Sequence, residues 1–456
     1  MIPRERIQWL HETGPANRPY VLYWMQSAQR AECNHALEYA VMQANALGKP
    51  LVVVAVVTEH FPEANERHYA FMLEGLRETK ATLAKRGIPM HIGRGSPEKT
   101  VLELSSVAAM LIVDRGYLRI ERAWRAYLAE HATCPVIQVE TNVIVPIETA
   151  SPKEEYAART LRPKLLRLLD AFALPLIEQT VNQSAIGLRL PYEAFDIEDV
   201  HAALAQLNID RTVKPVDGHI GGTTQAKAFL EDFIAHKLQT YATLKNDPGL
   251  DAQTHLSPYL HFGQISPLFI YLRLAQVPED VKSVFFDELI IRRELSMNFV
   301  YYNEHYDTYD AIPAWAKATL DKHSGDVRPY RYTRAALEAA QTHDPYWNAA
   351  QREMVLTGKM NGYMRMYWGK KILEWSANPK EAYQTAIFLN NRYHLDGRDP
   401  NAFAGIAWCF GKHDRPWQER QIFGTIRYMN AAGLERKFNM QPYLDKVEQL
   451  VSGPCA

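Results

Sequence analysis

The amino-acid pattern changes about halfway along the chain, and this change limits the folds that the chain can adopt. The first half alternates short apolar, β-branched runs with longer segments of helical periodicity. The runs that predict buried strands are Tyr20–Met25, Leu51–Val57, Ala108–Val113 and Pro135–Val139, with Pro89–Ile92 as a weaker candidate. The helical patterns between them are about Asn34–Leu47, Ala64–Arg86 and Ile120–His131. This alternation predicts a Rossmann-like, parallel, doubly wound α/β domain.

A parallel sheet of this kind binds its ligands at the carboxyl ends of the strands. No GxGxxG motif follows the first strand, and no GxxxxGK[ST] motif occurs in the chain. Tight pyrophosphate binding at this sheet is therefore not expected. A purely structural sheet domain and a site for a second cofactor both remain open.

Beyond Thr224 the strand patterns stop and long helical patterns follow one another. These are Ala226–Leu244, Pro267–Ala275, Ser283–Tyr301, Asn348–Thr357 and Asn361–Ser376. Prolines and glycines interrupt the pattern between about Gln183 and Thr224, as in a linker. We therefore predict an α/β domain at residues 1–182, an interdomain linker at 183–224 and an all-helical domain at 225–456.

Length and composition suit a protein of two domains, each with its own core. The chain has 456 residues, of which 47% are hydrophobic and 23% charged, as in ordinary soluble globular proteins. The net charge of −1 argues against wholesale coating by nucleic acid but does not exclude a local basic face. Four scattered cysteines without metal-ligand spacing (Cys33, Cys134, Cys409 and Cys455) predict free thiols in a reducing compartment and no metal site. No signal peptide or bilayer-length apolar run is found, so no membrane association is expected.

Two segments of the second half combine helix signals with chemistry. Ser257 precedes Pro258, which predicts a helix that begins with a serine N-cap and whose free N–H groups suit a phosphate. An ordinary capped helix is the commoner meaning of this pattern. In Asp287–Asn298, α-helical spacing places Glu288 and Arg292 on one face, and the apolar neighbours predict partial burial. A functional site and a salt-bridged helix are both compatible with that segment.

Tryptophan is concentrated towards the end of the chain. Six of the nine tryptophans fall in the last third, namely Trp315, Trp347, Trp368, Trp375, Trp408 and Trp417. Large aromatic side chains on one helical stripe most often form core, but close, dry rings could also relay electrons. Between Ala407 and Lys437, six Lys or Arg residues alternate with aromatic ones against three acidic residues. Such a segment suits a nucleic-acid strand with unstacked bases, although a solvated surface explains it about as well.

Several motifs, taken together, resemble those of the photolyase–cryptochrome flavoproteins, and specifically the class II cyclobutane pyrimidine dimer photolyases. The resemblance covers nearly the whole chain. The segments that carry it are Trp24–Arg30, Asn34–Leu37, Glu155–Lys164, Leu256–Gln264, Arg292–Leu295, Arg365–Trp375, Asp396–Asn401 and Gly411–Trp417. So many long motifs in the same order make chance a poor explanation.

The resemblance implies that FAD, active in its reduced form, lies folded inside the helical domain. The residues implied as FAD contacts are Tyr241, Thr254, His255, Leu256, Ser257, Arg293, Arg365, Asn390, Asp396 and Asp399. Asp396 would bind the cofactor and pair with Arg365, and such a buried pair is costly unless it is fully hydrogen-bonded. Asn390 would face flavin N5 and tune its protonation and redox state.

The implied substrate is a pyrimidine dimer in double-stranded DNA, which leaves the duplex at a cost of roughly a few kcal/mol. Glu288 would hydrogen-bond the dimer as a protonated carboxyl or proton donor. The other implied DNA contacts are Arg292, Met366, Trp408, Arg415 and Arg427. Light would drive an electron from reduced FAD to the dimer, whose two cyclobutane bonds split before the electron returns. Trp368, Trp347 and Trp375, in that order outward from the flavin, would reduce oxidised FAD.

Three positions depart from the family pattern. Asn361 stands where histidine is common, Arg292 where some relatives have an aromatic residue, and Lys245 where arginine is frequent. The last change loses bidentate hydrogen-bonding geometry. The antenna is open, because the sheet shows no decisive chromophore residue: either a deazaflavin-type antenna or none is compatible.

A cryptochrome-type blue-light receptor without repair activity is the main alternative function. Cryptochromes often carry a long low-complexity tail, whereas this chain stops at Ala456, which favours repair. A dark flavin oxidoreductase is a third option, but no hydride-donor site is recognisable. We expect a monomer in the cytoplasm, associated with the nucleoid if the source is bacterial or archaeal.

Overall fold

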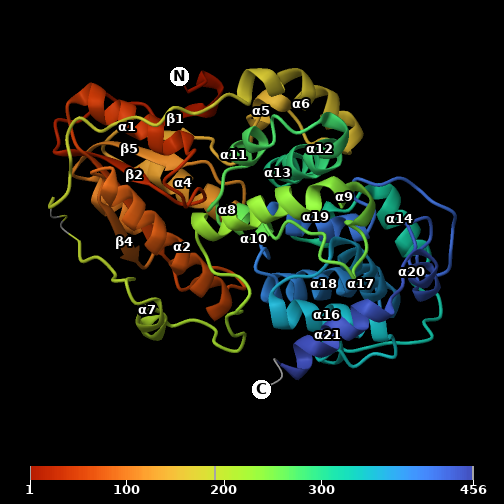
Figure 1. Ribbon diagram of the computed structural model, residues 1–456. Helices are drawn as coiled ribbons and strands as arrows, with labels where there is room; N and C mark the ends of the chain where they lie inside the picture. Colours follow the sequence, from red (N-terminus) through yellow and green to blue (C-terminus); the bar gives the residue numbers. More distant parts are fainter. Residues whose placement is uncertain (1, 189, 191, 454–456) are drawn as a thin grey trace.

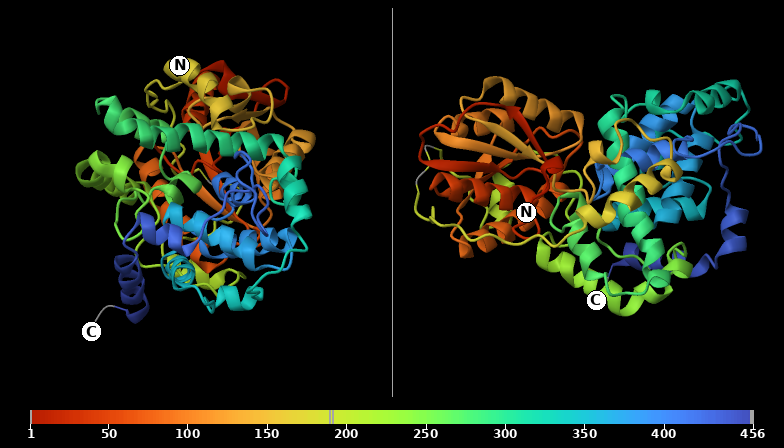
Figure 2. Two further views of the ribbon diagram at one scale, coloured as in Figure 1. Left: turned by 90° about the vertical axis from the view of Figure 1, so that its right-hand side faces the viewer. Right: turned by 90° about the horizontal axis from the view of Figure 1, so that it is seen from above.

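The computed structural model describes residues 2–188, 190 and 192–453, and it divides into an α/β part and a helical part that lie side by side (Figures 1 and 2). The strands are β1 (Ile7–His11), β2 (Tyr20–Trp24), β3 (Leu51–Val57), β4 (Met90–Arg94), β5 (Ala108–Asp114) and β6 (Val136–Val139). They form one sheet in the order β1-β6-β5-β2-β3-β4. The five predicted strands are thus confirmed.

The first strand was not predicted, and it makes the sheet mixed rather than wholly parallel. β1 pairs with β6 in the antiparallel direction, whereas the other neighbouring strands are parallel. Its residues are only partly buried and include Gln8 and His11, so it lacks the continuous apolar run of a central strand. β2 and β5, in contrast, are buried along their whole length.

Four helices complete the α/β part. They are α1 (His35–Leu47), α2 (Glu66–Lys85), α3 (Pro97–Ser105) and α4 (Arg119–His131), of which α3 was not predicted. Asn34 caps α1 by accepting a hydrogen bond from the Leu37 amide, and Gly48 ends that helix in the left-handed conformation with φ of 61°. The polar and glycine positions that flank the helical pattern therefore define where α1 begins and ends.

The remaining helices form the second part and its connections. They are α5 (Ile147–Ala150), α6 (Ala158–Phe172), α7 (Val200–Gln206), α8 (Thr223–Asp232), α9 (Leu238–Leu244), α10 (Ser257–His261), α11 (Pro267–Arg273), α12 (Glu279–Phe286), α13 (Arg293–Tyr302), α14 (Ala314–Lys322), α15 (Arg334–Glu338), α16 (Pro345–Thr357), α17 (Gly362–Trp375), α18 (Pro379–Tyr393), α19 (Pro400–Cys409), α20 (Ala431–Lys437) and α21 (Gln441–Ser452). Short 3₁₀ turns lie at Arg4–Arg6 and Tyr309–Ala311. No strand of the described residues follows β6, as predicted.

Two of the long predicted helices contain a π-helical turn. Phe233–Lys237 joins α8 to α9, and Asp287–Arg292 joins α12 to α13. A π turn fits one extra residue into the helix and is frequent at functional sites. The apolar pattern predicts the continuous helices but not this change of pitch, which alters which side chains share a face.

Helix α6 lies within the segment predicted as the first domain, yet it packs on the helical part. Leu161, Leu165 and Phe172 belong to the same apolar cluster as Tyr241 and Leu256. Figure 1 accordingly shows α5 and α6 beside α12 and α13. The segment predicted as linker contains the short helix α7, and its limits at residues 183 and 224 remain a prediction.

The first turn of α2 joins the two parts. The Arg67 guanidinium donates to the carbonyl oxygens of Lys214 (2.9 Å), Val355 (2.6 Å) and Tyr393 (2.7 Å). Asn65 donates to the Arg392 carbonyl at 2.7 Å, next to the Arg67 contact. These bonds satisfy backbone carbonyls at the ends of α16 and α18, so the two parts share one hydrogen-bond network.

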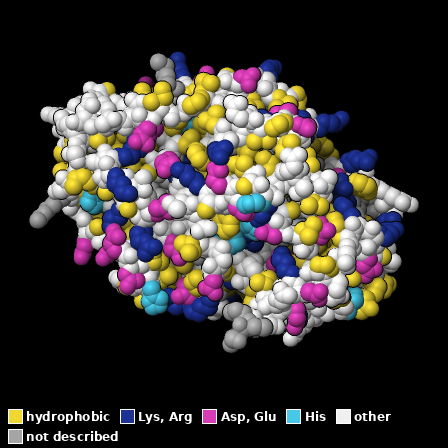
Figure 3. Space-filling view, viewed as in Figure 1, with side chains coloured by type: hydrophobic (Ala, Val, Ile, Leu, Met, Phe, Trp, Pro, Cys, Tyr) yellow, Lys and Arg dark blue, Asp and Glu magenta, His cyan; other side chains and the backbone are white. Residues whose placement is uncertain are grey.

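The surface charges and the cysteines agree with what the composition predicts. Figure 3 shows acidic, basic and apolar side chains intermixed over one face, as the net charge of −1 suggests. Cys33, Cys134 and Cys409 are free thiols, while Cys455 lies outside the described residues. Within the part of the chain that the structure describes, no helix is both long and apolar enough to cross a bilayer.

Candidate cofactor and nucleic-acid site

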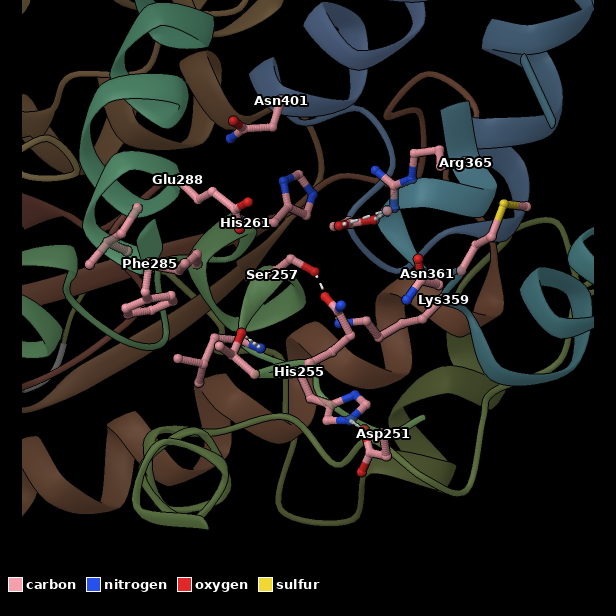
Figure 4. Close-up of a pocket in the computed structure, with 18 of the residues that line it drawn as sticks. Asp251, His255, Ser257, His261, Phe285, Glu288, Lys359, Asn361, Arg365 and Asn401 are labelled. Carbon is pink, nitrogen blue, oxygen red and sulfur yellow. Dashed lines mark hydrogen bonds and ion pairs between the residues drawn. The ribbon is translucent and has the colours of Figure 1, made fainter. Parts of the chain in front are cut away.

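A polar cavity of about 320 Å³ lies inside the helical part. Except for Asn390, every residue predicted to bind the cofactor lines it, although these residues come from several separate segments. Glu288 and Arg365 face the cavity from opposite sides (Figure 4). Segments more than a hundred residues apart therefore meet at one site.

The cavity wall at α10 carries hydroxyl and ammonium groups. Helix α10 begins at Ser257 itself, so Ser257 is not the N-cap that the sequence predicted; Leu256 holds that position, without a side-chain cap. The Ser257 hydroxyl is therefore free to accept a hydrogen bond from Lys359 at 3.2 Å (Figure 4). His255, just before, adopts a left-handed backbone with φ of 57°, a strained conformation that often marks functional sites.

Lys359 is a cavity residue that the sequence reasoning missed. Burial lowers the pKa of Lys359 to about 8, while the carboxylate of Asp396 opposes that shift. A buried ammonium beside the Ser257 hydroxyl suits an anionic group such as a phosphate. Lys359 lies in the loop between α16 and α17, where the sequence pattern gave no indication that it would line the cavity.

Arg365 and Asp396 form the pair that the sequence predicted. Arg365 Nη2 lies 3.1 Å from Asp396 Oδ1 and 3.1 Å from His394 Nδ1. Burial alone would raise the pKa of Asp396, but Arg365, His394 and Lys359 together hold it well below its ordinary range. Asp396 thus remains a carboxylate, and Arg365 Nε is buried with no hydrogen-bond partner among the described residues. That donor is free for a ligand.

Asp399 and His261 form a second pair at the cavity. His261 Nδ1 lies 3.1 Å from Asp399 Oδ2, and Asp399 Oδ1 accepts a hydrogen bond from the Asn401 amide at 2.7 Å. The latter contact caps α19. Arg293 donates to the Asn142 carbonyl at 2.6 Å, which ties the cavity to the α/β part. The set of cations, hydroxyls and carboxylates fits a dinucleotide cofactor with both phosphate and ribose groups.

Asn390 and Asn361 have different surroundings. Asn390 is buried on α18 and does not line the cavity. Its amide donates to Asn391 at 3.2 Å, and within the described part of the chain its Oδ1 has no partner. Asn361 lines the cavity and caps α17 by accepting from the Tyr363 amide at 2.8 Å. Asn361 therefore has a structural role at the start of α17.

A larger cavity of about 940 Å³ adjoins the first. Tyr241, Glu288 and Arg365 line both. Met366, Trp408, Arg292 and Arg427, predicted to contact DNA, line the larger one, whereas Arg415 does not. The two cavities therefore share a wall, and Glu288 belongs to it.

Glu288 accepts hydrogen bonds at both carboxylate oxygens. Tyr241 donates its hydroxyl to Oε2 at 2.5 Å, and Lys245 pairs with Oε1. Burial, and then the Glu288 charge, raise the pKa of Tyr241, so the phenol keeps its proton and acts as the donor. Glu288 accepts from both donors in this arrangement, and its role as a donor to the dimer stays a prediction.

Glu288 and Arg292, predicted to share one helix face, both line the larger cavity. Both lie in the π turn Asp287–Arg292, and Arg292 pairs with Asp287 at 3.2 Å rather than with Glu288. The predicted burial at the end of the segment is confirmed: Glu294 and Asn298 are buried. Glu294 accepts from the Ile144 amide at 2.6 Å, which makes it a contact to the connection before α5.

The outer wall of the larger cavity is basic and aromatic. The Arg427 guanidinium lies 4.1 Å from the Trp417 ring centre and 5.2 Å from that of Trp408, and it pairs with Asp414 at 2.9 Å. The Arg415 guanidinium also lies over the Trp417 ring, 5.0 Å from its centre. An isolated bridge between Arg420 and Gly424 closes a tight loop in this segment. Stacked arginine and tryptophan suit unstacked bases.

Trp347, Trp368 and Trp375 lie in contact in the helical core. The Trp347 and Trp368 rings are nearly parallel with centres 6.4 Å apart, and Trp347 and Trp375 are 5.6 Å apart. Trp347 therefore lies between the other two, in the predicted order. Trp347 Nε1 donates to the Trp368 carbonyl and Trp368 Nε1 to Gln351, both at about 3 Å. The contact order is clear, while the role in electron transfer stays a prediction.

A further cavity of about 140 Å³ lies at the carboxyl ends of β2 and β3, where the sheet topology predicts ligands. Phe61, Tyr69, Met72 and Trp124 give it an aromatic and apolar lining. His261 lines both this cavity and the cofactor cavity. In the described part of the chain, no group of His, Cys, Asp and Glu is arranged to hold a metal ion.

Comparisons with known proteins agree with this architecture. A family model for DNA photolyase matches residues 21–182. The chain is 49% identical over 452 residues, covering 99% of this chain and 100% of the relative, to a deoxyribodipyrimidine photo-lyase of Methanothermobacter thermautotrophicus. It is 38% identical to the protein of that name from Potorous tridactylus, over 93% of this chain and 81% of the relative. The chain belongs to the DNA photolyase family.

Solved structures support the same fold. An archaeal photolyase from Sulfolobus tokodaii, described with two FAD molecules, superimposes with a TM-score of 0.69 at 18% identity, over 95% of this chain and 91% of that one. A class III photolyase from Agrobacterium tumefaciens gives a TM-score of 0.65 at 17% identity, over 97% and 91%. At these identities the likeness establishes the fold alone.

Proposed function

We propose that this chain is a deoxyribodipyrimidine photolyase, which uses light to split cyclobutane pyrimidine dimers in DNA. Relatives of that name match nearly its whole length at 37–49% identity. The observation that carries the proposal is the wall shared by the two cavities. A cofactor in the smaller cavity and a flipped-out dimer in the larger one would meet at Tyr241 and Glu288, as direct electron transfer requires.

FAD fits the smaller cavity on the chemistry of its donors. The phosphates would be held by Lys359, Ser257 and Arg293. The polar ring or sugar groups of FAD would be bound by Asp396, as an acceptor, and by Arg365, as a donor. When bound and reduced, FAD supplies the light-absorbing electron donor. The paired Arg365 and Asp396 orient that group without leaving a buried charge uncompensated.

The dimer would enter the larger cavity out of the duplex. Met366 and Trp408 offer apolar walls, and Arg427 with Trp417 would occupy the gap left in the DNA. Unstacking costs roughly a few kcal/mol, and less for a dimer that already stacks and pairs poorly. The dimer accepts one electron, its two cyclobutane bonds break, and the electron returns, so the net reaction is redox-neutral.

Trp368, Trp347 and Trp375 would carry electrons to oxidised FAD. The contact order Trp368–Trp347–Trp375 supports this relay, because each ring touches the next. Their near-complete burial keeps water away from the rings.

Trp368→Phe is expected to abolish most light-driven FAD reduction, because phenylalanine cannot be oxidised at a comparable cost. The loss of the hydrogen bond to Gln351 would cost stability of about 1 kcal/mol, too little to unfold the protein. Flavin absorption during illumination with an external reductant measures the effect. Trp315→Phe, outside the contacting set, is the control. Normal photoreduction by the Trp368 variant would refute the relay, whereas the chemically prereduced variant should still repair.

The cavity at the carboxyl ends of β2 and β3 is our candidate for an antenna chromophore. Its aromatic lining and its shared wall at His261 would place an aromatic ring next to the cofactor cavity. A deazaflavin-type molecule is one candidate; a second flavin is another, as the Sulfolobus tokodaii structure contains two FAD molecules. An absorption spectrum of the purified protein would separate these from a protein that carries FAD alone.

The decisive test of repair uses purified protein with prereduced FAD, dimer-containing DNA and blue light without oxygen. Loss of dimers only under illumination is expected. No repair with fully reduced FAD would reject the enzyme and favour a cryptochrome-type receptor. That alternative has weaker support: a cryptochrome DASH of Xenopus laevis is 22% identical over 48% of this chain.

Further aspects of the proposal concern partners and location. Duplex DNA that contains pyrimidine dimers is the expected partner, bound by a monomer. We place the protein in the cytoplasm, at the nucleoid if the source is bacterial or archaeal. Sedimentation with and without damaged duplex would test the monomer.

A further inference from the structure

The proposed tryptophan relay ends close to the protein surface, at Trp375. The Trp375 side chain is only 2% exposed, but its ring centre lies 5.3 Å from that of His343 and 5.4 Å from that of Tyr332. His343 stacks on Tyr330 with ring centres 3.6 Å apart, and Tyr330 is 49% exposed. A thin aromatic cover, made of Tyr330, Tyr332 and His343, therefore separates the outermost tryptophan from solvent.

The aromatic cover is fixed in place by hydrogen bonds. The Tyr332 amide donates to the Trp375 carbonyl at 3.3 Å, so the loop between α14 and α15 is attached to the end of α17. The Tyr332 hydroxyl lies 2.7 Å from His343 Nδ1, and the His343 amide donates to that hydroxyl at 3.0 Å. The rings over Trp375 are thus parts of one bonded unit.

The same loop carries three arginines. Arg328, Arg331 and Arg334 follow one another at intervals of three residues, and Arg331 and Arg334 are exposed. Within the described chain, Arg328 Nε and Nη2 are buried without a hydrogen-bond partner. Burial, and then the charge of Arg331, lower the pKa of Arg328, as expected for positive groups that lie close together. We call residues 327–334 the arginine loop.

Carboxylates near the arginine loop have other partners. Asp326 pairs with His323 at 2.7 Å, and Glu338, one helical turn beyond Arg334, pairs with Arg392 at 3.3 Å. Across the described residues, no carboxylate pairs with any of the three guanidinium groups of the loop. The loop therefore presents net positive charge beside the aromatic cover. Such charge attracts anions from solution over a distance of about 10 Å at 0.1 M salt.

We infer that the arginine loop docks a small anionic one-electron reductant, which resupplies Trp375 with electrons. The inference rests on the proposed relay. Every residue of the loop is described, and none of them lines the cofactor cavity or the larger cavity. The docking site is thus separate from the sites proposed for FAD and for the dimer. Its position, at the outer end of the relay, favours an electron donor over DNA as the anion that it binds.

The electron transfers balance without any change in covalent bonds. Trp368 would give an electron to photoexcited, oxidised FAD, Trp347 would then refill Trp368, and Trp375 would refill Trp347. The docked anion gives one electron to Trp375 and is itself oxidised by one electron. This last step competes with return of the electron from the flavin to the relay. An anion that is already docked wins that competition more often than one that must first diffuse to the protein.

The first test measures how fast the reductant reaches oxidised tryptophan. The Arg331→Gln/Arg334→Gln double variant and the parent, both with oxidised FAD, are excited by a laser flash. The decay of the oxidised-tryptophan absorption is followed at rising reductant concentration, which gives a bimolecular rate constant. Ferrocyanide is the anionic probe and dithiothreitol the neutral one. Arg4→Gln/Arg77→Gln, which removes two exposed arginines from the α/β part, is the matched control.

We expect the double variant to react about three- to tenfold more slowly with ferrocyanide at low salt. Its rate constant with dithiothreitol should equal that of the parent, because a neutral molecule gains nothing from the arginines. The difference with ferrocyanide should shrink at about 0.5 M salt, where the charges are screened. The control variant should keep the parental rate constants with both probes.

The second test needs neither light nor electron transfer. Hexacyanochromate(III) is an inert, paramagnetic anion that broadens the resonances of groups close to it. In fluorotyrosine-labelled protein kept in the dark, it should broaden the Tyr330 resonance, which Tyr330→Phe assigns. The broadening should fall in the Arg331→Gln/Arg334→Gln variant and persist in the control. Equal broadening in the parent and the double variant would overturn the docking site.

The remaining outcomes distinguish the possible failures. Equal ferrocyanide rate constants in the parent and the double variant would overturn the inference, as would an equal fall with dithiothreitol, which indicates a disturbed aromatic cover. A weaker Kd for undamaged duplex, with both rate constants unchanged, would assign the loop to DNA instead. If the parent gives no oxidised-tryptophan signal, the relay is wrong and the inference falls with it. Repair by prereduced protein tests the proposed function separately, because prereduced FAD does not need the relay.

Discussion

Asp396→Ala is expected to release most of the FAD during purification. The carboxylate compensates Arg365 and lies beside His394 and Lys359, all within the cavity region. Removal of one partner from a buried ion pair leaves the other charge uncompensated, which costs about 3–5 kcal/mol. If most of that cost falls on the bound state, FAD affinity drops roughly a hundredfold to several thousandfold.

FAD per protein after desalting, and Kd from flavin fluorescence, measure this effect. Asp307→Ala is the control, since Asp307 pairs with Arg119 at 2.6 Å outside the cavity. Asp396→Asn should lose less, because an amide oxygen still accepts from Arg365 at the same distance. Full retention of FAD by Asp396→Ala would show that this pair does not hold the cofactor and would remove the main support for its assignment.

Glu288→Ala is expected to retain FAD and to lose repair, by about tenfold to a hundredfold in dimers split per photon. Glu288 belongs to the wall between the cavities, and its loss frees both Tyr241 and Lys245 from their shared acceptor. The buried phenol and the Lys245 ammonium then both lose this acceptor, which changes the charge and the shape of the wall between the cavities. The residues expected to contact FAD in the smaller cavity are unchanged, so FAD binding should change little.

The measurement pairs FAD stoichiometry with splitting yield at saturating DNA. Glu288→Gln is the informative companion, because it keeps an acceptor for Tyr241 but removes the charge that holds Lys245. Its yield should lie between that of the parent and that of Glu288→Ala. Parental repair by Glu288→Ala, or loss of FAD together with repair, would each contradict the role assigned to this side chain.

The sequence predicted what depends on local pattern. The buried strands are continuous β-branched runs, so β2, β3 and β5 were recognisable, whereas β1 carries polar residues at a sheet edge and was not. The continuity of the long helices was also predictable. The π turn Asp287–Arg292 was not, because its residues have ordinary helical propensity.

The candidate site was predicted by resemblance more than by pattern. Arg365, Asp396 and Ser257 reach one cavity from distant segments, and no periodicity in a single segment indicates that meeting. Lys359 was missed because a lone loop lysine carries no signal until Asp396 and Ser257 are placed beside it. The acceptor state of Glu288 depends on Tyr241 and Lys245, which precede it by more than forty residues.

The hydrogen bonds from the first turn of α2 have a consequence for synthesis of the chain. A ribosome makes α2 long before Arg392 and Tyr393, whose carbonyls Asn65 and Arg67 bind. The cavity itself is finished later still, since Lys446 of α21 belongs to its wall. Domains generally fold from the N-terminus as they emerge. Asn65 and Arg67 of the nascent α/β part therefore lack these carbonyl partners until α18 has been made. FAD can be enclosed only after α21 has been made.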